Sequence, residues 1–176
     1  SKVSTGMVGL ENLGATCYLN GVIQMLYHIP RFRYSVYQIP HSTESIATSS
    51  TLALQSVFKN LQCSDYTVSP KDLTVAFGWT SLDAFQQQDA QEMLRVLLDK
   101  LETKMIGTAV EGTIHQMFSG NLRSYIRCMN VDMQSNREEE FSDLQLDVKG
   151  CKDIYDSFRK YIEKEKLCGE NKYDAG

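Results

Sequence analysis

The chain of 176 residues carries a net charge of −4, with 42% hydrophobic and 23% charged residues and only three prolines. This composition is typical of a folded domain and excludes a disordered or fibrous protein. There is no basic footprint for nucleic acid, no apolar run near the roughly 20 residues that cross a bilayer, and no signal-peptide pattern. We therefore expect no nucleic-acid or membrane partner, and a cytoplasmic or nuclear location.

Apolar residues at helical spacing predict that the first part of the chain is helical. A first helix runs from Cys17 and is closed by Pro30, and the polar residues 40–50 form a loop. A second helix carries its apolar face from Leu54 to Leu61. The clearest helical pattern covers residues 89–105, where leucines and methionine share one side.

A shorter helix begins within SPKDL, where Ser69 is the candidate cap and Pro70 lies in the first turn.

The pattern changes after Phe118, because NLRSYIRCMNV and FSDLQLDV alternate apolar and polar residues as strands do. The polar run QSNREEE between them is expected to be the loop of an antiparallel pair. A last amphipathic helix carries Ile154, Phe158, Tyr161 and Ile162.

Cys17 lies between a glycine-containing turn and the first predicted helix. Thr16 is a suitable N-cap, so Cys17 would occupy the first turn, where unpaired N–H groups and the helix dipole favour a thiolate. Gly9 and Gly14 allow a tight turn that leaves the sulfur at a cleft. Asn12 is placed to donate to a carbonyl oxygen that gains negative charge. On residue types alone, a nucleophile and a buried structural thiol both stay open.

The stretch GLENLGATCYLNGVIQML, residues 9–26, resembles the cysteine box of the ubiquitin-specific proteases, which are papain-like deubiquitinases. The resemblance implies that Cys17 is the nucleophile, Asn12 the oxyanion donor and Tyr18 a contact of the substrate. Gly21 departs from the serine usual in the family, at a position without a catalytic role. The matching residues are Gly9, Leu10, Asn12, Gly14, Thr16, Cys17, Tyr18, Asn20, Gln24 and Leu26.

A second block, FQQQDAQEMLRVLLDKLE, is similar to the family's Q-Q-D-A-Q-E-F box, with Met93 where phenylalanine is common. The resemblance implies that this helix start faces the channel for ubiquitin's C-terminal tail. Asp89 would then pair with the arginine of the tail, and Gln87 and Gln91 would help to hold it. The structural alternative for Asp89 is a helix-capping aspartate, and both roles are compatible.

Further blocks, LALQSVFKNLQ, FGWTSLDAF, VEGTIHQMFSG and KYIEKEKLCGENKYDAG, resemble the herpesvirus-associated branch of the family. By itself Trp79 suits a core anchor, whereas the branch implies that FGWTSLDAF moves on ubiquitin binding. The resemblance implies an α+β fold, a papain-like cysteine protease hand that is truncated before the rest of the palm. Residues 1–120 would form the helical thumb and residues 121–176 the start of the fingers, with one helix, in a single, C-terminally incomplete catalytic domain.

The family's reaction is thiol-dependent hydrolysis after the C-terminal glycine of ubiquitin, so ubiquitin and ubiquitinated proteins are the implied partners. The base and its orienting Asp or Asn come from a box beyond residue 176, so we expect residues 1–176 to be inactive alone. None of His28, His41 and His115 stands in a matching context.

The five cysteines, Cys17, Cys63, Cys128, Cys151 and Cys168, are odd in number and contain no C-x-x-C pair, which favours a reduced compartment over a disulfide scaffold. Members of the family often hold zinc at the fingertips with two C-x-x-C pairs. Only Cys128 is present of those four ligands, so we expect no metal and no cofactor.

Two other functions compete with the protease. The first is a noncatalytic ubiquitin-binding module that uses the same surface. The second is another thiol enzyme, such as a transglutaminase-like acyl transferase, which does not require the QQQDAQE helix. A histidine in a G-x-H-Y-like context further along the natural chain would favour the protease.

Overall fold

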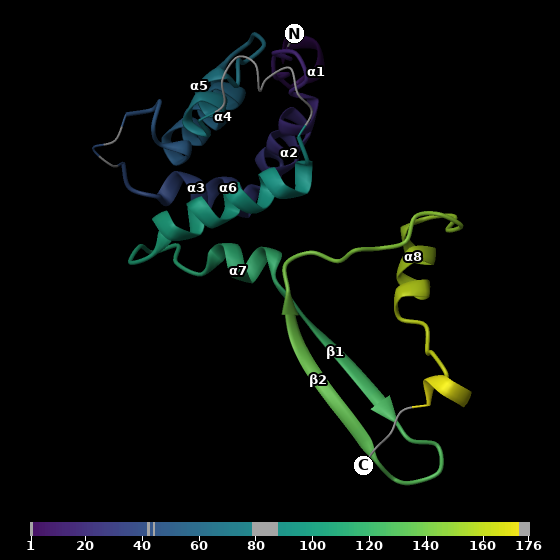
Figure 1. Cartoon of the computed structure of the whole chain (residues 1–176). Coiled ribbons are helices and arrows are strands. Elements are labelled where there is room, and N and C mark those ends of the chain that lie inside the picture. The colour runs from purple at the N-terminus through teal and green to yellow at the C-terminus, as the bar shows by residue number, and fades with distance from the viewer. Residues whose placement is uncertain (1, 42, 44, 79–87, 173–176) are drawn as a thin grey trace. The chain divides into compact units, whose positions relative to one another are not determined.

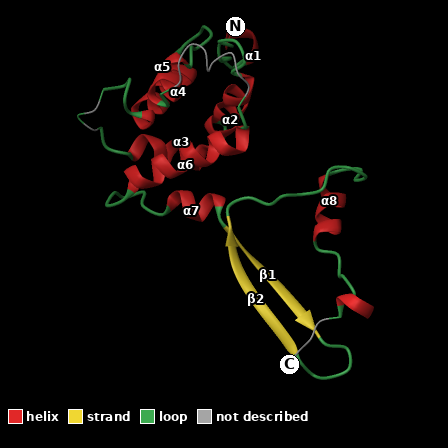
Figure 2. Ribbon diagram, viewed as in Figure 1, coloured by secondary structure: helices red, strands yellow, loops and turns green. Residues whose placement is uncertain are grey.

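A computed structural model describes residues 2–41, 43, 45–78 and 88–172. These residues divide into two compact units, Ser1–Ser119 and Gly120–Gly176, and each is described here by itself. Figure 2 shows helices in the first unit, and paired strands together with helical segments in the second. This mixture confirms the α+β class that the sequence predicts. In the described residues, no helix combines the length and the apolarity needed to span a membrane.

The first unit is a set of helices that pack around one core (Figure 1). Helix α2 contacts α3 and α6, and α4 contacts α3, α5 and α6. The predicted helices around Leu54 and over residues 89–105 are confirmed as α4 and α6. The helices are α1 (Lys2–Thr5), α2 (Cys17–Tyr27), α3 (Pro30–Gln38), α4 (Ser50–Cys63), α5 (Lys71–Ala76), α6 (Ala90–Met105) and α7 (Thr113–Phe118).

The core is built from the apolar face of each longer helix. Leu19, Ile23 and Leu26 of α2 are fully buried, as their spacing of three and four residues predicts. Phe58 of α4 lies edge-on to Phe32 of α3, with ring centroids 6.2 Å apart. Such edge-to-face packing adds about 0.5–1.5 kcal/mol to the burial itself.

Helix α3 is missing from the sequence-based assignment, which used Pro30 only to end the previous helix. Pro30 instead occupies the first turn of α3, where its lack of an N–H has no cost. Phe32 and Val36, one turn apart, are its buried anchors.

The prediction of Ser69 as a cap was also wrong, because α5 begins at Lys71 with Pro70 at the N-cap and no side-chain cap bond.

The second unit contains an antiparallel hairpin of β1 (Gly120–Arg127) and β2 (Gln134–Phe141). Strand β1 was predicted, but the polar run predicted as a loop is β2, and residues 143–148 have no regular structure. Strand β2 lacks apolar alternation because nearly all of it is exposed. Its backbone pairs with β1 residue for residue, and Arg123 stands opposite Glu138. Opposite charges in such a pair support the register.

The predicted last helix is confirmed as α8 (Ile154–Tyr161), and a short 3₁₀ turn, η2 (Gly169–Asn171), follows. Asp153 caps α8 by accepting from the N–H of Asp156 at 2.8 Å, and the Asp156 carboxylate accepts from the N–H of Lys152 at 3.1 Å. That second bond, with a smaller contribution from Arg159, lowers the pKa of Asp156. The bond from Asp156 satisfies an N–H group that helix geometry leaves unpaired, and the bond from Lys152 ties the preceding residue to the first turn.

Leu97 of α6 is fully buried, whereas its neighbour Val96 is 40% exposed, which provides a matched pair of truncations. We expect Leu97→Ala to lower the free energy of opening of α6 by about 2–5 kcal/mol, because it leaves a cavity. Val96→Ala should change it by about 0.5 kcal/mol or less. Native-state hydrogen exchange of the α6 amides measures both values, and equal losses would contradict the packing described.

Candidate active site

Cys17 is the first residue of α2, and its side chain is exposed. The first intrahelical bond runs from the N–H of Asn20 to the carbonyl of Thr16 at 3.0 Å, so Cys17 lies in the turn whose own N–H groups point out of the helix. This end of a helix dipole favours negative charge. The exposure contradicts the alternative that Cys17 is a buried structural thiol.

Thr16 precedes the helix at the N-cap position, as the sequence predicts. Its hydroxyl, however, makes no capping bond to α2. It points back into the turn instead. Thr16 Oγ1 accepts from the N–H of Leu13 at 3.0 Å and donates to Asn12 Oδ1 at 3.2 Å. The N–H of Gly14 also donates to Asn12 Oδ1, at 3.2 Å. A network of four residues therefore closes the turn before Cys17.

These bonds settle which end of the Asn12 amide faces outward. A backbone N–H can only donate, so the atom that meets the N–H of Gly14 must be the carbonyl oxygen of Asn12. The Nδ2 group then faces away from the turn, and within the described part of the chain it has no hydrogen-bond partner. Asn12 is exposed, so this donor is accessible.

Gly14 adopts φ of 128°, in the region that favours glycine, as its predicted role in the turn requires. Gly9 has no such conformation, so the prediction for it was wrong. The carbonyl of Gly9 accepts from the N–H of Val68 at 3.0 Å. The carbonyl of Val68 in turn accepts from the N–H of Glu11 at 2.8 Å. Leu10 and Val68 thus form a short parallel bridge.

Two side chains of α2 also hold this segment. Asn20 donates its Nδ2 to the carbonyl of Glu11 at 3.0 Å, and Gln24 donates its Nε2 to the carbonyl of Val8 at 3.1 Å. The residues are four apart and therefore share one face of the helix. Sequence reasoning assigned them no role, although that spacing of two amides just after Cys17 was the available signal.

Asp89 is the N-cap of α6, which supports the structural alternative for this residue. Its Oδ1 accepts from the N–H of Gln91 at 2.7 Å and from that of Glu92 at 3.4 Å. The side chain is exposed, and Oδ2 has no hydrogen-bond partner among the described residues. One oxygen thus stabilises the helix while the other stays available. The predicted contact of Asp89 with a tail stays a prediction.

The other predicted site residues differ in their settings. Gln91 is exposed in the first turn of α6, whereas Tyr18 is only 8% exposed and belongs to the core. A substrate contact by either side chain stays a prediction. Gln87 lies outside the described residues, and so do Trp79 and the segment predicted to move, from Trp79 onward.

The histidines stand in unrelated places. His28 is the C-cap of α2, and its ring lies edge-on to Tyr27 with centroids 5.1 Å apart. Since α2 has 11 residues, His28 is about 16 Å along the helix axis from Cys17. His41 is exposed in the loop before α4, and His115 is exposed on α7.

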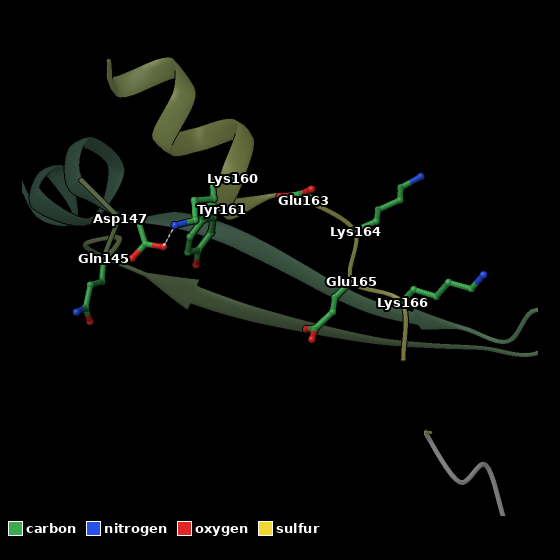
Figure 3. Close-up of a pocket in the computed structure, with 8 residues that line it drawn as sticks. All are labelled: Gln145, Asp147, Lys160, Tyr161, Glu163, Lys164, Glu165 and Lys166. Carbon is green, nitrogen blue, oxygen red and sulfur yellow. Dashed lines mark ion pairs between the residues drawn. The ribbon is translucent and has the colours of Figure 1, made fainter. Parts of the chain in front are cut away.

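A surface hollow in the second unit contains none of these residues (Figure 3). Lys160 of α8 meets Asp147 there at 2.7 Å, and this partner raises the pKa of Lys160. The lining is of mixed charge and contains no cysteine, serine or threonine. The described residues also contain no group of three or more metal-binding side chains. The hollow is lined by Gln145, Asp147, Lys160, Tyr161, Glu163, Lys164, Glu165 and Lys166.

Comparison with known proteins gives a consistent result. Residues 8–167 match the family described as ubiquitin carboxyl-terminal hydrolase. The chain is 57% identical to ubiquitin C-terminal hydrolase 12 of Arabidopsis thaliana. That match covers 99% of the chain and 16% of the Arabidopsis protein. It is 54% identical to ubiquitin carboxyl-terminal hydrolase 7 of Drosophila melanogaster, with 100% of the chain and 16% of that protein covered.

A yeast relative extends the same pattern. Ubiquitin carboxyl-terminal hydrolase 15 of Saccharomyces cerevisiae is 49% identical, over 99% of the chain and 14% of that protein. The chain thus spans about one-sixth of the length of the curated relatives that it matches.

The capping role of Asp89 is directly testable. We expect Asp89→Ala to destabilise the first turn of α6 by about 0.5–2 kcal/mol, because two N–H groups lose their acceptor. Asp99→Ala is the matched control, since Asp99 is exposed in the middle of the same helix. Hydrogen exchange at Gln91 and Glu92 should increase in the first variant alone, and unchanged exchange there would contradict the cap.

Proposed function

The chain belongs to the ubiquitin carboxyl-terminal hydrolase family, and we propose that it supplies the thiol nucleophile of a cysteine-type deubiquitinase. The observation that carries this proposal is the exposed Cys17 at the N-terminal end of α2, beside an Asn12 whose amide donor faces outward. A thiol nucleophile and an amide donor for the oxyanion are two of the groups that acyl transfer uses, and here both lie on one short turn.

In the proposed reaction, the Cys17 sulfur attacks the carbonyl carbon of the C-terminal glycine of ubiquitin. The carbonyl oxygen gains negative charge in the tetrahedral intermediate, and Asn12 Nδ2 donates to it. The C–N bond to the lysine amine or the peptide then breaks, the amine takes a proton, and an acyl-enzyme is left. Water hydrolyses this thioester, which releases ubiquitin and restores the thiol.

The proton of Cys17 requires a base, and we propose that a histidine outside residues 1–176 provides it. The settings of the chain's own histidines support this. His28 is separated from Cys17 by the length of α2, while His41 is exposed in the loop before α4 and His115 is exposed on α7. An Asp or Asn, also from outside the chain, would orient that imidazole.

The C-terminal tail of ubiquitin is the proposed ligand of the α6 start. Asp89 Oδ2 is free of the capping bonds and suits an arginine of an extended basic tail. Gln91 in the same turn, Gln87 just before it and Tyr18 on α2 complete the proposed tail contacts. The substrates would be ubiquitinated proteins of the cytoplasm or the nucleus.

Replacing the proposed nucleophile tests the reaction in the natural full-length protein. We expect Cys17→Ala to lower the hydrolysis of a fluorogenic ubiquitin substrate by about 10³-fold or more while ubiquitin binding persists. Cys63→Ala is the matched control, because Cys63 is also exposed but ends helix α4 instead of beginning one. Equal hydrolysis by Cys17→Ala and wild type would refute the nucleophile, and binding without any wild-type hydrolysis would favour the noncatalytic ubiquitin-binding module.

Asp89→Asn separates the two roles of this residue, because asparagine caps a helix about as well as aspartate but carries no charge. We expect unchanged stability of α6 and a 10- to 100-fold (roughly) weaker affinity for ubiquitin, the effect of one charged hydrogen bond. Isothermal titration with the Cys17→Ala background measures the affinity. Asp99→Asn is the control, and an unchanged affinity in Asp89→Asn would leave the residue with its cap alone.

A further inference from the structure

We propose that Thr16 is a positioning residue that holds the oxyanion donor in its productive orientation. The inference rests on the proposed function, in which Asn12 Nδ2 stabilises the developing negative charge. It concerns the opposite end of the same amide, where Asn12 Oδ1 accepts from the Thr16 hydroxyl at 3.2 Å. Thr16 would act only through Asn12 and touch no reacting atom.

The hydroxyl of Thr16 is well suited to fix a neighbour, because it is itself fixed. Thr16 is fully buried, so its rotamer is set by packing. Its oxygen accepts from the N–H of Leu13 at 3.0 Å, which directs the hydroxyl hydrogen towards Asn12. Asn12, in contrast, is exposed, so packing restrains its side chain less.

Two donors on one acceptor decide the orientation of the amide. If the Asn12 amide turned by 180°, its NH₂ group would face the N–H of Gly14, and two donors would oppose each other. The Thr16 bond adds a second, independent restraint on the position of Oδ1. Since Nδ2 is rigidly joined to Oδ1 through the amide plane, both restraints act on the donor that faces outward.

The use of this hydroxyl breaks a local rule, which supports a role in the site. A threonine at the N-cap normally accepts from an N–H of the first helical turn. Thr16 instead gives its bonds to the turn, and α2 has no side-chain cap. Such departures from local preference are expected at functional sites, where stability is exchanged for geometry. The same choice leaves the first-turn N–H groups beside Cys17 without that oxygen.

The test uses Thr16→Val and Thr16→Ser in the natural full-length protein, with a fluorogenic ubiquitin substrate. Valine keeps the shape but lacks the hydroxyl, and we expect kcat to fall by about 5- to 30-fold with KM within about twofold, since only the transition state uses the donor. Serine keeps the hydroxyl, so its kcat should stay within about threefold of the wild type.

Thr51→Val is the matched control, because Thr51 is buried and its hydroxyl has no hydrogen-bond partner in the described part of the chain. Its kcat should equal that of the wild type. The rate at which iodoacetamide alkylates Cys17, followed by peptide mass spectrometry, should be unchanged in Thr16→Val. That reaction does not use an oxyanion donor, so it reports on the thiol and the local fold alone.

A double-mutant cycle identifies the route of action. In an Asn12→Ala background, Thr16→Val should lower kcat no further, because the group it positions is absent. Additive losses, a kcat of Thr16→Val equal to the wild type, or a Thr16→Ser variant with as low a kcat as Asn12→Ala would overturn the positioning role. The serine variant also decides the matter if Thr16→Val does not fold.

The cycle also separates failure of this inference from failure of the proposed function. If Asn12→Ala and Cys17→Ala both hydrolyse the substrate as the wild type does, the proposed function fails and the positioning role fails with it. If Asn12→Ala lowers kcat by about 10²-fold or more while Thr16→Val has no effect, the oxyanion donor stands and only the role of Thr16 is refuted.

Discussion

The carbonyl oxygens of Val8 and Glu11 are held by side-chain amides of α2, and this clamp fixes the turn before Cys17 to the helix that begins with it. Gln24 and Asn20 make the two bonds, at 3.1 and 3.0 Å. The bridge to Val68 restrains the same backbone as well. Because the clamp residues belong to α2, the helix that presents the sulfur also positions the turn of Asn12.

The clamp has an energetic cost. Asn20 Oδ1 is buried and has no hydrogen-bond partner among the described residues. A buried unsatisfied acceptor costs about 1–3 kcal/mol. This cost falls on Asn20, about one helical turn after Cys17. Leu19 and Ile23 on the same helix are fully buried, and their packing keeps α2 in place.

The sequence was informative where one chemical pattern dominated. Residues 89–105 carry a regular apolar face, and the structure places α6 within one residue of them. Strand β2 could not be recognised, because its stability comes from backbone pairing with β1 and not from an apolar face of its own. Helix α3 was hidden because Phe32 and Val36 are its only buried apolar residues, and its two tyrosines are exposed.

For the candidate site, the sequence indicated positions but not partners. It placed Cys17 at a helix start and Asp89 at another, and both positions agree with the structure. It assigned the Thr16 hydroxyl to the wrong partners, the N–H groups of the first turn of α2, since capping preference is a statement about helices in general. The choice between a cap and a turn depends on where Leu13 and Asn12 lie in space, and only the folded backbone decides that.

The described residues of the proposed site all belong to the unit that has a core. In Ser1–Ser119 the site backbone is attached to α2, whose inner face is fully buried. Among the described residues of Gly120–Gly176 only Ser157 is buried, so that unit depends on strand pairing and helix caps. Catalytic geometry tolerates displacements of only a fraction of an ångström, and packed interiors resist such displacements far better than exposed hairpins do. A nucleophile and its oxyanion donor therefore suit the helical unit, where one of the two restraints on Asn12 comes from the fully buried Thr16.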